Sequence, residues 1–122
     1  LKLLDRNGVR WGIVTNKHSK YVNKIVDGLN ITNRLSCLVT GNMVNEPKPA
    51  PDSLIHAMCL LEEQPKNIIY VGDDERDIIA GKTAGVHTVA ADFGFIRDSS
   101  EINTWNADII IKQPIELKTI IN

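Results

Sequence analysis

The sequence contains no long hydrophobic run: no stretch of consecutive apolar side chains exceeds five among its 122 residues. A membrane-spanning helix needs roughly 20 such residues, so no span is predicted. Neither sign of charge dominates, since 14 Lys and Arg stand against 15 Asp and Glu, a net charge of −1. A near-neutral chain lacks the general positive charge that attracts nucleic acid or anionic membranes, and we expect neither as a partner.

Cysteine is also scarce. Cys37 and Cys59 are too few for a disulfide framework, and their separation is not that of a metal-binding pair. Two small, buried apolar side chains in a reducing compartment are the simplest interpretation, and we predict a cytoplasmic location. The first residue is Leu1 rather than Met, and no signal-peptide pattern is present. Because LKLLDRNG is typical of the last turns of a helix, we expect a fragment that starts in mid-fold.

Apolar residues nevertheless make up 43% of the chain, enough for a hydrophobic core. Short β-rich segments alternate with segments whose apolar residues recur at helical spacing. This alternation predicts an α/β fold with a mostly parallel sheet, in which residues 1–122 form one domain or a large part of one. Ser19 and Asp52 are expected to cap two of the helices. The predicted strands are Val9–Val14, Cys37–Val39, Asn67–Gly72, the VHTVAA segment at 86–91 and Ala107–Ile111.

Three acidic residues follow one of these strands. Asp73, Asp74 and Asp77 lie within five residues of one another directly after the strand at 67–72. Ligands of open α/β sheets bind beyond the carboxyl ends of the strands. Like charges crowded there are unfavourable unless a cation neutralises them, and carboxylate oxygens are ligands that Mg²⁺ prefers. The cluster therefore predicts a Mg²⁺ site, whereas a single Asp at this position is explained as readily by helix capping.

Two further segments carry residues suited to phosphate. Thr15 and Asn16 follow the first predicted strand, and Lys48 lies in the proline-rich segment EPKPAP. A hydroxyl and backbone N–H groups can hold phosphoryl oxygens, and a positioned lysine can neutralise a transferring phosphoryl group. The prolines on both sides of Lys48 restrict where its ammonium can reach. Each of these residues alone is explained as readily by an ordinary loop, but the three segments together are far less ambiguous.

The order and types of these residues resemble the haloacid dehalogenase superfamily of aspartate-nucleophile phosphatases. GIVTN at 12–16 is similar to the second motif of that family, KPAP at 48–51 to the third and VGDDERD at 71–77 to the fourth. The resemblance covers essentially the whole chain. It implies a three-layer, Rossmann-like core and phosphatase activity on a small phosphorylated metabolite.

Within the superfamily, the segments VTNK, KPAPDSL and YVGDDERDIIAG are most similar to phosphoglycolate phosphatase-like proteins. The GFI segment at 94–96, Trp105 and the AD pair at 107–108 also resemble the N-acetylmuramic acid 6-phosphate phosphatases of cell-wall recycling. The resemblance does not separate these two groups, so both substrates stay open.

The resemblance implies a role for each matching acid. Asp73 would bind Mg²⁺ directly, and Asp77 would hold metal-bound water or Lys48. Asp74 stands where many relatives have Ser, which leaves its role as a ligand open.

The resemblance also implies how phosphate would be bound and what is missing. Thr15 and the Asn16 amide would bind the phosphoryl oxygens, and Lys48 would offset the charge of the nucleophile and the phosphoryl group. The family's nucleophile lies in an Asp-x-Asp motif on the first strand, and no Asp-x-Asp occurs among these residues. The cap domain that selects substrate has no counterpart here either. We therefore expect the chain to supply a phosphate clamp and metal residues but no nucleophile, and to be inactive alone.

The missing first strand lies, in the family, between the strands that carry the second and fourth motifs. Without it, VRWGIV and NIIYVG have no shared neighbour, and their backbone groups are left without partners. Three solutions stay open. The chain closes the gap, a partner supplies the strand, or the strand belongs to a part of the protein outside this sequence.

Two other classes of protein remain as alternatives. A receiver domain of a signalling system uses Asp, Thr, Lys and Mg²⁺ on a parallel sheet, but its acidic pair comes first in the chain, whereas here Thr15 and Lys48 precede the acids. A non-catalytic interaction module could keep the same fold, although the retained motif residues speak against it. A dinucleotide-binding domain is disfavoured because no strand is followed by GxGxxG.

Overall fold

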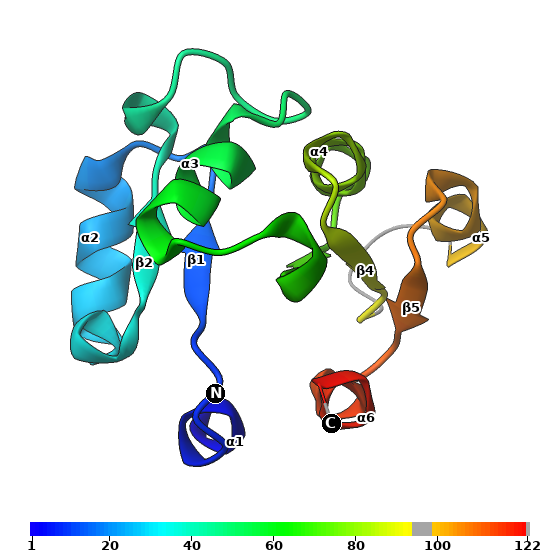
Figure 1. The fold of residues 1–122 in the computed structure, drawn as a ribbon, viewed down its shortest axis with the longest axis horizontal. Coiled ribbons are helices and arrows are strands. Elements are labelled where there is room, and N and C mark those ends of the chain that lie inside the picture. Colours follow the sequence, from blue (N-terminus) through cyan, green and yellow to red (C-terminus); the bar gives the residue numbers. More distant parts are fainter. Residues whose placement is uncertain (94–98, 122) are drawn as a thin grey trace.

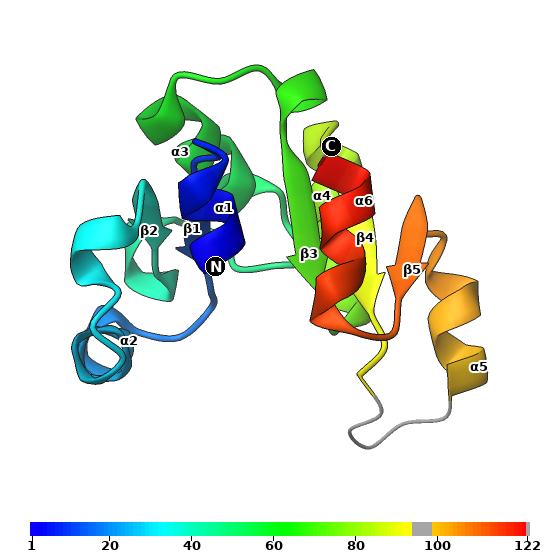
Figure 2. The ribbon, with the colours of Figure 1, turned by 90° about the horizontal axis from the view of Figure 1, so that it is seen from below.

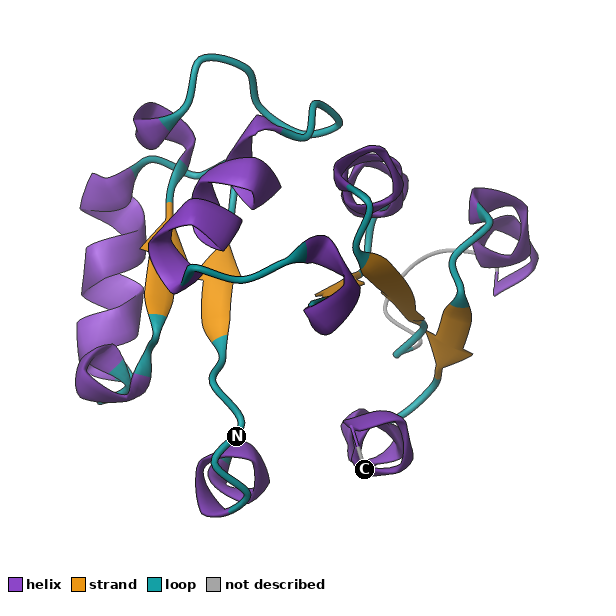
Figure 3. Ribbon diagram, in the orientation of Figure 1, coloured by secondary structure: helices purple, strands orange, loops and turns teal. Residues whose placement is uncertain are grey.

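The computed structural model describes residues 1–93 and 99–121 as an α/β fold (Figure 1, Figure 3). The helices are α1 (Lys2–Arg6), α2 (Ser19–Gly28), α3 (Asp52–Leu61), α4 (Glu75–Ala84), α5 (Ser99–Ile102) and α6 (Leu117–Ile121). The strands are β1 (Gly12–Val14), β2 (Cys37–Val39), β3 (Ile69–Gly72), β4 (His87–Ala91) and β5 (Ile109–Ile111). All five predicted strands are therefore present, four of them shorter than expected. No helix in the described part of the chain has the length and apolar character needed to cross a membrane.

The strands form two parallel sheets rather than one. β1 pairs with β2, and β3, β4 and β5 pair in that order. Within the described residues, β1 and β3 are not paired with each other. Figure 2 shows the strands across the molecule in the order β2, β1, β3, β4, β5, so the unpaired edges of β1 and β3 lie toward each other. Of the three solutions to the missing strand, direct pairing of its two neighbours is thus not the one adopted.

Helices cover both sides of the strands, which gives three layers. α3 and α4 lie on one side, and α1 and α6 lie on the other (Figure 1, Figure 2). Burial of apolar side chains against these layers is the main favourable contribution to such a fold. The two sheets are joined through α3 and α4, because Leu54 and Ala80 pack in one cluster with Val14 of β1 and Tyr70 of β3.

The prediction that both cysteines are buried is right for one of them. Cys37 of β2 is buried, whereas Cys59 of α3 is exposed.

Two helix starts differ from the prediction. Ser19 is the first residue of α2 and not its cap, since the His18 ring Nδ1 accepts a hydrogen bond from Lys20 N at 3.1 Å. The Ser19 N–H is instead held by Asn42 Oδ1 at 2.9 Å, from the loop after β2. Asp52 likewise lies inside α3 and makes no capping bond. Both helices thus begin one residue earlier than the predicted caps imply.

A close approach of two loops brings the ends of β1 and β2 together. Gly41 N donates to Lys17 O at 2.8 Å. A Cβ atom at position 41 would overlap the backbone of Asn16, so a residue with a side chain would push the two loops apart. The glycine therefore lets the segment that carries Thr15 and Asn16 lie against the loop that leads to Lys48.

Candidate active site

One pocket of about 370 Å³ opens at the carboxyl ends of β1, β3 and β4. The residues that line it are Val14, Thr15, Lys48, Tyr70, Val71, Gly72, Asp73, Asp77, Ala91 and Phe93. Four of the six predicted site residues are among them: Thr15, Lys48, Asp73 and Asp77. Asn16 and Asp74 are not. The GFI segment singled out in the sequence, 94–96, lies outside the described residues.

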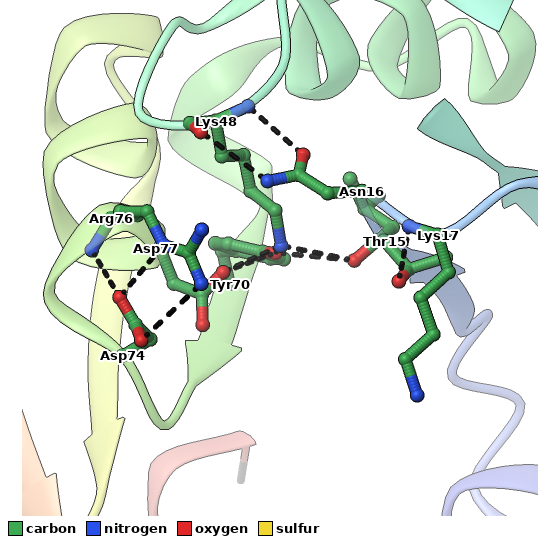
Figure 4. Close-up of polar contacts among 9 residues, drawn as sticks. Thr15, Asn16, Lys17, Lys48, Tyr70, Asp74, Arg76 and Asp77 are labelled. Atoms are coloured by element: carbon green, nitrogen blue, oxygen red, sulfur yellow. Dashed lines mark hydrogen bonds and ion pairs between the residues drawn. The ribbon is translucent and has the colours of Figure 1, made fainter. Parts of the chain in front are cut away.

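The Lys48 ammonium lies at the centre of this site (Figure 4). Its Nζ donates to Asp77 Oδ1 at 2.5 Å and to the Tyr70 hydroxyl at 2.7 Å. The third contact is with the backbone oxygen of Val14, at 3.3 Å. The Lys48 and Asp77 side chains are only 9% and 10% exposed. An ammonium has three N–H donors, and these three acceptors account for all of them. The Lys48 ammonium is therefore fixed in position.

The backbone of Lys48 is held as firmly as its ammonium. The Asn16 side-chain amide donates to Lys48 O at 3.2 Å and accepts from Lys48 N at 2.9 Å. This two-way contact joins the end of β1 to the proline-rich loop, whose Lys48–Pro49 peptide bond is cis. The Asn16 side chain therefore positions Lys48, which the sequence did not indicate. Thr15 lies beside it, with its Oγ1 accepting a hydrogen bond from Lys17 N at 3.2 Å.

Asp77 reaches Lys48 because the residue at the end of β3 has no side chain. Asp77 is in the first turn of α4 and is 7% exposed. A Cβ atom at Gly72 would overlap the Asp77 side chain. The glycine in the GDxxxD segment thus allows the carboxylate to fold back toward the strand, where the positive end of the helix dipole also favours a negative charge.

Asp74 has a different task. Its Oδ1 accepts hydrogen bonds from Arg76 N at 2.9 Å and from Arg76 Nε at 3.1 Å. It is the N-cap of α4, which is the simpler of the two explanations considered for an acid at this position. Figure 4 shows the pair away from the Lys48 ammonium.

Asp73 lines the pocket and is exposed. A carboxylate in this position suits Mg²⁺, which takes a few hard oxygen ligands and keeps several waters. Among the described residues, however, no three His, Cys, Asp or Glu side chains converge as a metal site. Asp73 fits Mg²⁺ as one ligand of a set that needs oxygen atoms from elsewhere, because Asp77 Oδ1 is already engaged by Lys48.

Tyr70 is a site residue that the motifs did not single out. Burial raises its pKa, and the negative charge of Asp77 raises it further, so the hydroxyl keeps its proton. The signal available in the sequence is the alternation of a strand: Tyr70 lies two residues before Gly72 and on the same face of β3. Its contact with Lys48 is seen only in the tertiary structure, since the two residues are 22 positions apart in the sequence.

Comparison with known proteins identifies the family. Residues 1–91 match the family model described as haloacid dehalogenase-like hydrolase. The chain belongs to this family.

Two relatives with different names are similar to nearly the whole chain. An N-acetylmuramic acid 6-phosphate phosphatase of Pseudomonas putida is 34% identical over 119 residues, which are 98% of this chain and 53% of the relative. A phosphoglycolate phosphatase of Xanthomonas campestris pv. campestris is 37% identical over 117 residues, 96% of this chain and 53% of the relative. The chain spans about half the length of these curated relatives.

A solved structure shares the fold. The crystal structure of a protein described as a predicted phosphoglycolate phosphatase from Haemophilus somnus matches with a TM-score of 0.88 and 27% identity. The match covers 99% of this chain and 53% of the other. The three-layer α/β fold of the family is thus the fold of this haloacid dehalogenase-like chain.

Proposed function

We propose that the protein to which this chain belongs is a Mg²⁺-dependent phosphomonoester hydrolase of the phosphoglycolate phosphatase type. The observation that carries the proposal is the Lys48 ammonium, held by Asp77 in a pocket that Thr15 and Asp73 also line. A fixed positive charge at such a position stabilises the charge that develops on a transferring phosphoryl group. The matching names of the relatives support this class of reaction.

Four of the six predicted residues act on the phosphoryl group or on Mg²⁺ in this proposal. Thr15 Oγ1 and the Asn16 backbone amide bind phosphoryl oxygens, while the Asn16 side chain keeps Lys48 in place. Lys48 offsets the negative charge of the phosphoryl group and of the nucleophile. Asp73 is the acid we assign to Mg²⁺, which when bound would neutralise phosphoryl charge and orient the group.

We infer that residues 1–122 are the C-terminal part of the family's core domain, carrying its second, third and fourth motifs. The nucleophilic Asp would come from a strand outside this sequence that pairs with both β1 and β3. In that reaction the Asp carboxylate oxygen bonds to phosphorus as the ester P–O bond breaks, and water then hydrolyses the aspartyl-phosphate to release phosphate. The facing, unpaired edges of β1 and β3 support this placement.

The second candidate substrate is N-acetylmuramic acid 6-phosphate. It is favoured by the 34% identity to the Pseudomonas putida phosphatase, which extends over 98% of this chain. Phosphate release from the full-length gene product, with Mg²⁺ and each of the two substrates in turn, chooses between the candidates. Hydrolysis of neither by a folded, Mg²⁺-binding protein would mean that both substrate assignments are wrong.

The same assay tests the role of Lys48. We expect Lys48→Ala to lower kcat about 100-fold or more, since that is the usual cost of removing one group that stabilises transition-state charge. Lys24→Ala, on the exposed surface of α2, is the matched control and should leave turnover unchanged. The purified 122-residue chain should release no phosphate above the blank. Full activity of Lys48→Ala, or turnover by the isolated chain, would contradict the proposal.

A further inference from the structure

The Tyr70 hydroxyl is the one polar side-chain group among the described pocket-lining residues to which the proposed function gives no task. It lies 2.7 Å from Lys48 Nζ, 3.2 Å from Asp77 Oδ1 and 3.3 Å from Val14 O. Three groups from separate parts of the chain thus meet at one hydroxyl oxygen.

The chemistry of these groups determines which of them donates each hydrogen bond. A lysine ammonium can only donate, so the Tyr70 oxygen accepts a hydrogen bond from Lys48. The hydroxyl then has one hydrogen of its own, for which Asp77 Oδ1 and Val14 O are the two acceptors in reach. Tyr70 therefore completes the set of acceptors around the ammonium without adding a negative charge.

Tyr70 is itself held in place. Its ring packs in the cluster with Leu54 of α3 and Ala80 of α4, and its backbone belongs to β3. Lys48, by contrast, has a flexible four-carbon stem on a loop. The Asn16 side chain fixes the backbone end of this residue, and the rigid Tyr70 ring presents an acceptor to the ammonium end.

We propose that Tyr70 is a positioning residue for Lys48: by accepting one ammonium hydrogen, it keeps the charge directed into the pocket beside Asp77. The effect on turnover rests on the proposed phosphatase function, whereas the effect on Lys48 itself does not. The two are tested by separate measurements.

The first measurement follows Lys48 in the full-length protein and needs no substrate. Acetylation of lysines by limiting acetic anhydride is quantified by mass spectrometry, with Lys24 as the internal reference. In Tyr70→Phe the ring remains but the acceptor is lost, so Lys48 should be acetylated several-fold faster relative to Lys24. Tyr21→Phe, which removes an exposed hydroxyl from α2, is the matched control and should leave the ratio unchanged.

The second measurement is steady-state hydrolysis of the substrate that the protein accepts. We expect Tyr70→Phe to lower kcat about tenfold or more, the effect of one hydrogen bond to a charged group, with KM changed less than kcat. Site-specific 3-fluorotyrosine at position 70 keeps the ring and the hydroxyl but weakens the oxygen as an acceptor. The 3-fluorotyrosine protein should also show faster Lys48 acetylation and a lower kcat, each by a smaller factor than Tyr70→Phe. It replaces Tyr70→Phe in both measurements if that variant does not fold.

The outcomes are distinguishable. Unchanged Lys48 acetylation in the folded Tyr70→Phe and 3-fluorotyrosine proteins would overturn the inference, whatever the activity. An equal rise in Lys48 acetylation in Tyr21→Phe would overturn the inference as well, since the rise would then not depend on the contact between Tyr70 and Lys48. If acetylation changes as expected but no phosphate ester is hydrolysed, the positioning role stands and the proposed function fails.

Discussion

Asp74 and Asp77 lie three residues apart in one polar segment, yet their surroundings are opposite. The Asp77 carboxylate is paired with Lys48, and both side chains are about nine-tenths buried. The Asp74 carboxylate is paired with Arg76, and these side chains are 35% and 60% exposed. The first pair joins α4 to a loop 29 residues earlier, whereas the second joins neighbours at the start of one helix.

This difference separates a position in the candidate site from a local structural one. A buried charge needs its partner, because the interior does not solvate it, while an exposed ion pair contributes little since water and salt screen both charges. The two acids have the same side chain and nearly the same place in the sequence. What distinguishes them is which remote residue the fold brings to each.

Of the variants that test this comparison between Asp77 and Asp74, Asp77→Ala is expected to have the largest effect on stability. It leaves the Lys48 ammonium in a buried position without its carboxylate, and we expect the free energy of unfolding to fall by about 3 kcal/mol. Urea denaturation of the full-length protein measures this. A loss no greater than that of Asp74→Ala would mean that the two acids are equivalent and that the comparison fails.

Asp74→Ala should have an intermediate effect. It removes the N-cap of α4, for which a loss of about 1 kcal/mol is usual. Arg76→Ala separates the cap from the ion pair, because it keeps the carboxylate on the backbone N–H and removes only the exposed guanidinium. Its loss should be smaller than that of Asp74→Ala, again measured by urea denaturation, because water and salt screen an exposed ion pair. A larger loss in Arg76→Ala than in Asp74→Ala would show that the ion pair, not the cap, stabilises the helix.

The smallest effect concerns a third acid, held mainly by uncharged donors. Asp108 accepts hydrogen bonds from Thr88 N at 2.8 Å and from Thr88 Oγ1 at 3.1 Å. The backbone hydrogen bond from Thr88 is the main reason why the pKa of Asp108 is lowered from its ordinary value of 3.8. Its contribution to stability is therefore fully present above pH 3.8 and is lost as the pH falls through the lower folded-state value.

Asp108→Asn removes this dependence while keeping the shape of the side chain. The parent should be the more stable of the two near neutral pH, and the difference should shrink as the pH falls below 3.8. Urea denaturation at a series of pH values measures it, with Asp27→Asn on α2 as the control. If the difference in free energy of unfolding between the parent and Asp108→Asn stays constant down to the lowest pH at which both fold, the stabilising role of the Asp108 charge is wrong.

The sequence by itself determined the helices and strands, and it predicted part of the candidate site. Apolar periodicity is a local property, so all five strands could be placed, with errors of at most three residues at their first residues. The rule that ligands bind at the carboxyl ends of parallel strands then placed Thr15, Lys48 and the acids at one edge, and the structure brings four of the six predicted residues around one pocket.

Only the tertiary structure decided which groups touch. It separates the strands into two sheets, pairs Lys48 with Asp77 rather than with Asp74, turns the Asn16 side chain toward the Lys48 backbone and adds Tyr70 to the site. The reason is physical: propensity and periodicity act over a few residues, whereas a hydrogen bond depends on ångström distances between residues remote in the chain. Those distances exist only once helices and strands have packed.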